Sequence, residues 1–310
     1  MKKLTLYIIM LLCSHSQAIL SAQVILEDKS FCRINCDPAI HTENTREIYQ
    51  ILHSDSIERL IDDYEVLRFP IRTVYVKEVS STIDSDESQL IEHVIERLNH
   101  AYRNTKVRFY SQEITHLQSE LKIEDLSRNT DNIYDVFSQQ NDLQDMITLY
   151  IMDHKKDFCE VTPTSISCQK TGGFSYILSG RNNNIVMSQF DLKDEKIVAH
   201  EFGHFFGLYH TFEEHLFGKD NFEAVDCPLS GDLICDTPPD PGSVFEVYVN
   251  YSNCEMNDFT HVSGAEYKPL IDNFMAYYKP CYLKEYAFTK QQEQVMTLAS
   301  QLQLRKRLAH

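Results

Sequence analysis

The chain has 310 residues, of which 43% are hydrophobic, so it is long enough to bury a sizeable core. Lys and Arg total 29 against 46 Asp and Glu, which gives a formal net charge of −17. Charge repulsion disfavours a general affinity for nucleic acid or for anionic membranes, and we expect neither as a partner.

Residues 1–22 are typical of a signal peptide. Met1-Lys2-Lys3 precedes an apolar run over 4–12, and small and polar residues follow. The run is too short to span a bilayer, which takes about 20 apolar residues, and no later stretch is long enough. We therefore predict a secreted protein without a transmembrane segment. The alternative is a surface lipoprotein modified at Cys13, although the bulky Leu12 stands where a lipoprotein signal has a small residue.

Residues 23–69 are polar and charged, and we predict one helix within them, near 45–64. We interpret 23–69 as a prosegment that precedes a single main domain over 70–310. The N-terminal part of this stretch contains Cys32 and Cys36, which are able to form a disulfide bond with each other.

The main domain is predicted to begin with a strand over the β-branched residues 71–79. Apolar residues at helical spacing between 90 and 102 predict a long amphipathic helix, with Ser85 and Asp86 as candidate caps. This order predicts an α+β fold in which helices pack on a mixed sheet. The further predicted elements are strands at 106–110, 146–152 and 184–187, and helices at 194–209 and from Thr289 to about 305.

Eight cysteines follow the predicted signal peptide, and an even number in an exported chain predicts disulfide bonds. Their pairing cannot be read from the sequence, although Cys159 and Cys168 flank a short polar loop and are the simplest pair. Between 211 and 284 the chain is rich in Asp, Pro, Asn and Cys, so we expect irregular structure stapled by disulfides. The disulfide candidates are Cys159, Cys168, Cys227, Cys235, Cys254 and Cys281.

A metal site is predicted from the stretch HEFGHFFGLYH, which starts at His200. His200 and His204 lie one above the other on a helix, so their imidazole nitrogens can bind one cation. Gly207 can adopt a positive φ, end the helix and bring His210 to the same cation. Three protein ligands leave zinc an open position for water, which is typical of a hydrolytic site. Glu201 projects beside that position as a general base.

This motif resembles that of the metzincin zinc metalloendopeptidases, and its context resembles the pappalysin branch of that class. The resemblance covers the chain from about residue 71 to the last helix. It implies a metzincin-like catalytic domain, in which a twisted five-stranded sheet and two long helices lie above an irregular lower subdomain. The matching segments are LYHTF at 208–212, GDLICDTP at 231–238, NFMAY at 273–277 and FTKQQ at 288–292.

The resemblance also assigns roles in the chemistry. Met275 matches a methionine that forms a floor beneath the zinc, and Tyr277 matches a tyrosine that stabilises the tetrahedral intermediate. In such a site Glu201 takes a proton from a water that zinc activates, and later delivers it to the leaving amine. The expected activity is hydrolysis of peptide bonds in proteins or peptides by a monomer.

Calcium is expected as a second, structural ion. Asp232, Asp236 and the Thr237 carbonyl match positions that bind calcium in pappalysin-like proteins, and hard oxygen ligands suit this ion. Turn-forming aspartates are the alternative interpretation of the same residues.

Substrate contacts are predicted on both sides of the cleft. Gly173, Phe174 and Ser175 lie in a stretch that can pair with an extended peptide as an added strand. Lys279 follows the methionine turn, and if it faces the pocket beyond the scissile bond, we expect an acidic or neutral residue there.

Latency and loss of activity are two further hypotheses. Cys32, Cys36 or Asp37 of the prosegment has the chemistry to occupy the open position at the zinc. A secreted protein that binds zinc and calcium but has lost proteolysis is the alternative function. Glu201 and Tyr277 favour the enzyme, because a structural zinc site has no use for them.

Overall fold

The computed structural model describes most of the chain after residue 37, and only the backbone at 38–43, 160–162 and 165–167. The predicted signal peptide and Cys13, Cys32, Cys36, Asp37, Cys159, Cys168 and Cys227 lie outside the described residues. The described ranges are 38–78, 85–127, 132–154, 160–162, 165–167, 172–178, 183–213, 231–242, 248–257, 268–279, 281 and 283–310.

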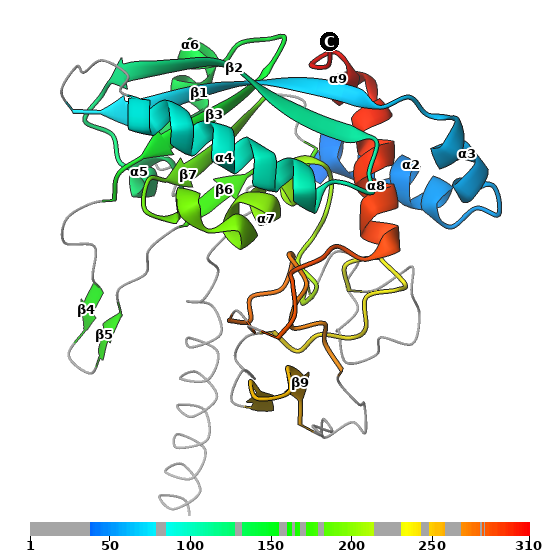
Figure 1. Ribbon diagram of the computed structural model, residues 1–310. Helices are drawn as coiled ribbons and strands as arrows, with labels where there is room; N and C mark the ends of the chain where they lie inside the picture. The colour runs from blue at the N-terminus through cyan, green and yellow to red at the C-terminus, as the bar shows by residue number, and fades with distance from the viewer. Residues whose placement is uncertain are drawn as a thin grey trace, which may run out of the picture.

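A five-stranded mixed sheet lies at the centre of the fold, with strand order β2-β1-β3-β7-β6 (Figure 1). The first four strands in this order are parallel to their neighbours, whereas β6 runs antiparallel to β7. The predicted α+β class with a mixed sheet is therefore confirmed. The strands are β1 Leu67–Lys77, β2 Val107–Gln118, β3 Ile147–Met152, β6 Gly173–Ser175 and β7 Asn184–Ser188.

Strand β1 begins before the predicted domain boundary at residue 70. Phe69 is fully buried, and Leu67 already pairs with Val107 of β2. Pairing with β3 starts at Ile71, so the missing N–H of Pro70 costs no hydrogen bond on that side. The sheet thus extends into the segment that the sequence predicts to be a prosegment.

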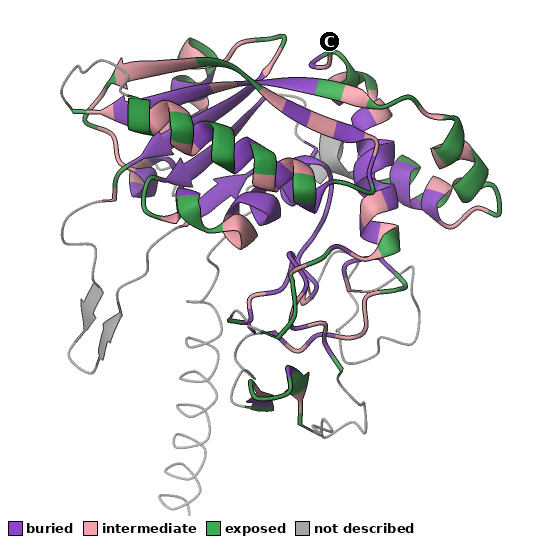
Figure 2. Ribbon diagram, in the orientation of Figure 1, coloured by how far each residue is buried: buried purple, intermediate pink, exposed green. Residues whose placement is uncertain are grey.

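Helices cover both faces of this sheet. Leu149 and Ile151 of β3 join a hydrophobic cluster with α4 and α7, while Tyr150 and Met152 join a second cluster with α5 and α6. This alternation follows from the two-residue period of a strand. Strands β3, β6 and β7 are buried along their whole length, whereas much of β2 is exposed or half-buried (Figure 2). The helices are α2 Pro38–Leu52, α3 Ile57–Asp63, α4 Ser85–Ala101, α5 Ile123–Ser127, α6 Ile133–Asn141, α7 Glu195–Phe205, α8 Lys290–Gln301 and α9 Gln303–Lys306, with a 3-10 turn η2 at Asp191–Lys193.

The described parts of the segment between α7 and α8 contain little regular structure. Cys254 and Cys281 form a disulfide bond with their Cα atoms 5.8 Å apart, and Cys235 is disulfide-bonded as well. None of the described helices is long and apolar enough to cross a membrane. The short strands, which form two hairpin-like pairs, are β4 Glu160–Thr162, β5 Ser165–Ser167, β8 Val249–Asn250 and β9 Glu255–Met256.

Candidate metal centre and active site

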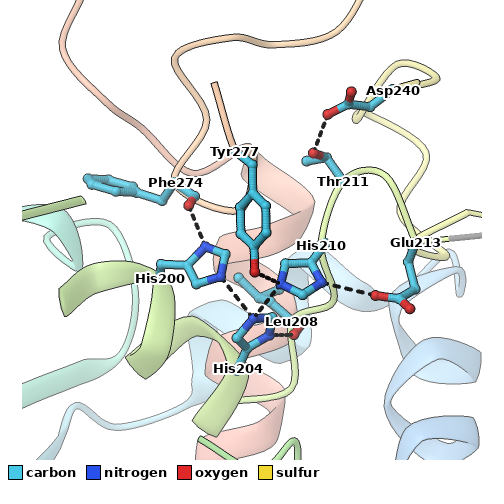
Figure 3. A network of polar contacts seen from close by, with 9 residues as sticks. All are labelled: His200, His204, Leu208, His210, Thr211, Glu213, Asp240, Phe274 and Tyr277. Atoms are coloured by element: carbon cyan, nitrogen blue, oxygen red, sulfur yellow. Dashed lines mark hydrogen bonds and ion pairs between the residues drawn. The ribbon is translucent and has the colours of Figure 1, made fainter. Parts of the chain in front are cut away.

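The three predicted histidine ligands converge on one point. His200 and His204 stand one turn apart on α7, with 3.0 Å between their Nε2 atoms. Nε2 of His210 lies 3.1 Å from Nε2 of His204, and Figure 3 shows the three rings facing one another. One nitrogen of each histidine lies within 4.8 Å of the other two, which is close enough for all three to bind one metal ion. The described residues contain no other such group of His, Cys, Asp or Glu side chains.

The end of α7 explains how His210 reaches the other two histidines. Gly207 has a φ of 98° and follows the helix as a left-handed cap. Its N–H donates to the His204 carbonyl, and the Leu208 N–H donates to the Gly203 carbonyl, both at 2.9 Å. These two hydrogen bonds form a Schellman motif, which reverses the chain and returns His210 toward α7.

The Nδ1 atom of each histidine is held by an acceptor. Because carbonyl and carboxylate oxygens accept hydrogen bonds, each Nδ1 carries the hydrogen and each Nε2 keeps a lone pair. Burial is the main cause that holds the pKa of His200 and of His204 well below the usual range, so both rings are neutral. The acceptors for His200, His204 and His210 are the carbonyl oxygens of Phe274 and Leu208 and Oε2 of Glu213, at 2.8, 2.7 and 3.1 Å.

Three lone pairs that face one another at about this separation repel, and a cation between them removes the repulsion. Neutral imidazole nitrogens whose Nδ1–H groups are bonded to oxygen are the usual arrangement of a zinc-binding histidine. The residues present therefore fit a zinc ion with one open position.

Glu201 lies beside the histidines with its carboxylate buried. Its Oε2 atom has no hydrogen-bond partner among the described residues, and burial raises the pKa of the carboxyl to about 8. The Ser175 hydroxyl donates to the Glu201 carbonyl at 2.6 Å, which ties α7 to the edge strand β6. A carboxylate in this setting is a strong proton acceptor.

Tyr277 and Met275 reach the site from the turn before α8. The Tyr277 hydroxyl donates to Nε2 of His210 at 2.9 Å, while Met275 is fully buried against Gly203 of the zinc helix. Asn273 accepts from the Met275 N–H at 2.8 Å, and its own amide pairs with Gln292 at the start of α8. The capping residues of α8 therefore hold the turn that carries both side chains.

Residues 88–211 match the model of a family described as Metallo-peptidase family M12B Reprolysin-like, and this range contains the three histidines and Glu201. The match supports a zinc metallopeptidase of the metzincin type. It does not single out the pappalysin branch that the sequence motifs resemble.

Two other comparisons add nothing on function. No curated protein matches the chain. A solved structure titled "Structure of a chaperone-substrate complex" is 14% identical with a TM-score of 0.38, and the match covers 79% of this chain and 36% of that one. The chain thus spans about a third of that structure's length, and a similarity at this level carries no argument.

A cavity of about 250 Å³ opens beside the three histidines. Its lining includes His200 and Glu201 together with Gly173 of β6. Lys196 lines it too, and donates a hydrogen bond to the Tyr278 carbonyl. Lys279, a candidate substrate contact by sequence, is exposed and does not line this cavity.

The edge strand β6 occupies the position expected for pairing with a substrate. It contains Gly173, Phe174 and Ser175, and it is the terminal strand of the sheet. No further strand lies beside it within the described ranges. The prediction that a peptide adds to this edge is consistent with that position.

Two carboxylates close to the histidine site were not predicted from the sequence. Glu213 holds His210, and Asp240 accepts from the hydroxyls of Thr211 and Tyr278, which flank the site on two different segments. Burial raises the pKa of Asp240. The only sequence feature that indicates a role for Glu213 is its position three residues after the proposed ligand His210. Asp240 begins an Asp-Pro-Gly stretch, which is typical of an ordinary turn.

The expected calcium site is not supported. Asp232 accepts hydrogen bonds from the Thr237 hydroxyl at 2.8 Å and the Ile234 N–H at 3.1 Å. Asp236 accepts from the Gln291 N–H at 2.9 Å. Asp232 thus stabilises a turn and Asp236 joins that turn to α8, while Oδ2 of Asp232 is buried without a hydrogen-bond partner among the described residues.

Proposed function

We propose that the protein is a secreted zinc-dependent endopeptidase related to the pappalysin branch of the metzincins. The observation that carries this proposal is the convergence of three Nε2 lone pairs beside the buried carboxylate of Glu201. Export is supported by the N-terminal 22 residues, and the branch by the four sequence segments quoted above.

Glu201 is proposed to act as the general base and then as the general acid. A zinc ion bound by the three histidines supplies a Lewis acid that activates water and polarises the peptide carbonyl. The buried Glu201 carboxylate accepts the proton of the attacking water and returns it to the leaving amine. Its raised pKa suits this exchange, because a proton acceptor that titrates near the working pH can also release the proton.

Tyr277 is proposed to stabilise the oxyanion that forms at the scissile carbonyl. In the structure its hydroxyl donates to Nε2 of His210, the atom that serves as a zinc ligand. If that nitrogen held a metal, the Tyr277 hydroxyl would no longer have it as an acceptor and could donate to the oxyanion instead. The substrate chain is proposed to pair with β6, where Ser175 already links the strand to α7.

Cleavage of casein or of a peptide library tests this function. We expect the processed wild-type protein to cleave, and we expect loss of cleavage with a zinc chelator and in Glu201→Ala. Glu195→Ala is the matched control, because it removes a carboxylate from the first turn of the same helix. Equal cleavage by Glu201→Ala refutes the mechanism. An inactive wild type favours the alternative of a zinc-binding protein without proteolysis.

A further inference from the structure

Helix α2 lies inside the segment that the sequence predicts to be a prosegment, yet it packs against the loop that carries His210. We propose that α2 is a permanent part of the active protein and holds this loop in position. The proposal rests on the zinc site proposed above, because it assigns the helix to the support of a zinc ligand.

The buried face of α2 is continuous with the core of the main domain. Thr45, Ile48, Tyr49 and Leu52 follow the i, i+3, i+4, i+7 spacing of one helix face. Their exposed fractions are 3%, 1%, 6% and 3%, which are the values of core residues. The three hydrophobic side chains belong to the same cluster as the residues of α7 and the sheet.

The same face is hydrogen-bonded to the segment that leads from α7 to His210. The Tyr49 hydroxyl donates to the carbonyl oxygen of Gly207 at 3.4 Å. The hydroxyls of Thr45 and Tyr209 lie 3.4 Å apart, and the rings of Tyr49 and Tyr209 pack with centroids 6.3 Å apart. Two residues of α2 thus fix the residues on either side of Leu208, immediately before the third zinc ligand.

The end of α2 also reaches the segment downstream of the site. A ring nitrogen of His53 contacts the Leu233 carbonyl oxygen at 3.2 Å. Helix α3, which follows, has no buried residue, and its ion pair from Glu58 to Lys290 of α8 is exposed. Figure 1 shows α2 and α3 beside α8, and Figure 2 shows that the buried surface belongs to α2 rather than α3. Helix α2, rather than α3, therefore holds the loop that carries His210.

Removal of the whole predicted prosegment, residues 23–69, would strip this face from the core. It would expose the hydrophobic cluster around Tyr209 and release the Gly207 carbonyl from its donor. Proteolytic processing that produces an active enzyme must then occur before Thr45. The prosegment is shorter than the sequence predicts, and it ends near or before the start of α2.

The first test is the N-terminus of the active protein. Intact mass and N-terminal sequencing of the form that cleaves substrate should place its first residue before position 45. An active form that begins after Leu52 overturns the proposal, because it lacks α2 altogether.

The second test weakens the contacts without removing the helix. In full-length Thr45→Val/Tyr49→Phe, both hydroxyls are lost while the buried shapes remain. We expect zinc affinity, measured by competition with a chromogenic chelator, to fall by about tenfold, the lower end of the range for groups that orient metal ligands. The visible spectrum of the cobalt-substituted variant should change as well, since the position of His210 shifts.

Tyr134→Phe is the matched control. It deletes a buried tyrosine hydroxyl that donates to Asn184 at 2.6 Å in the second hydrophobic cluster, away from the zinc ligands. We expect this variant to lose thermal stability without a change in zinc affinity or cobalt spectrum. If the double variant binds zinc as tightly as wild type, the positioning role fails while the proposed function stands. If wild type binds no zinc, the proposed function itself fails.

Discussion

The hydroxyl oxygen of Tyr277 lies 2.9 Å from Nε2 of His210. That nitrogen also faces Nε2 of His204 at 3.1 Å, so one atom takes part in the hydrogen bond and in the proposed metal site. A nitrogen has one lone pair in the plane of its ring, and it cannot serve a hydroxyl donor and a metal together. A metal held by this nitrogen would therefore require the Tyr277 hydroxyl to give up its hydrogen bond to His210.

Tyr277→Phe should separate metal binding from catalysis. The ring keeps its packing against His200 and His210, so zinc affinity should stay within about threefold of wild type. The turnover number should fall by about 10²- to 10³-fold, as for loss of one oxyanion donor. Chelator competition and steady-state kinetics measure the two effects. A variant with normal turnover would remove Tyr277 from the chemistry.

Gly203→Ala should damage the site through Met275. A Cβ at residue 203 would lie 2.7 Å from the Met275 sulfur, well inside van der Waals contact. We expect a loss of about 1–3 kcal/mol of unfolding free energy, as for other overpacked cores, together with weaker zinc binding. Urea denaturation measures the loss of unfolding free energy. Because the clash is with one side chain, adding Met275→Val to Gly203→Ala should restore part of the lost unfolding free energy. If the losses of the two single variants simply add in the double variant, the proposed clash is contradicted.

Asp240→Asn should loosen the connection between Thr211 and Tyr278. The carboxylate accepts from both hydroxyls and from the Gly242 N–H, and an amide group cannot accept at both of its ends. We expect a cost of about 1–3 kcal/mol from the unsatisfied buried donors. Asp63→Asn, at an exposed position, serves as the control in the same denaturation series. Equal stability of the two variants would argue against this network.

The stability of the metal-free protein should depend on pH through Glu201. Its carboxyl has a pKa of about 8 in the folded state against an ordinary value of 4.5. Because the folded pKa is raised, the effect of Glu201 on the free energy of unfolding is most favourable below pH 4.5. That free energy then falls as the pH rises, until the carboxyl is ionised in the folded state above about pH 8. Relative to Glu201→Gln, wild type should lose about 1.4 kcal/mol for each pH unit between these values. Thermal unfolding with a chelator at several pH values measures this. A constant difference between the two proteins would contradict it.

The sequence predicts the metal site well because its signal is local. The positions of His200 and His204 on one helix face, and a glycine that can end the helix, suffice to bring His210 back to them. The predicted helix over 194–209 nevertheless includes the reversal, and α7 ends at Phe205. Periodicity continues through a Schellman turn, because Leu208 packs against Gly203 of the same helix.

The parts that the sequence does not predict depend on contacts between distant segments. One helix was predicted near 45–64, whereas the structure has two, α2 and α3, with a turn between them. Helical spacing also does not tell which surface the apolar face of α2 covers. Strand β2 continues to Gln118 rather than ending at residue 110, because pairing with β1 holds residues that are only partly buried. Asp240 has the local signal of a turn, and its role depends on Tyr278, 38 residues away.

The most direct measurement is titration of the metal-free protein with zinc while peptide cleavage is followed. We predict that cleavage is absent before zinc is added, rises in proportion to zinc and stops rising at one equivalent per chain. The His204→Ala variant should not cleave the peptide at any of these zinc concentrations. Cleavage that survives complete removal of zinc, or that fails to appear at saturating zinc in the processed protein, would contradict a peptidase centre built on His200, His204 and His210.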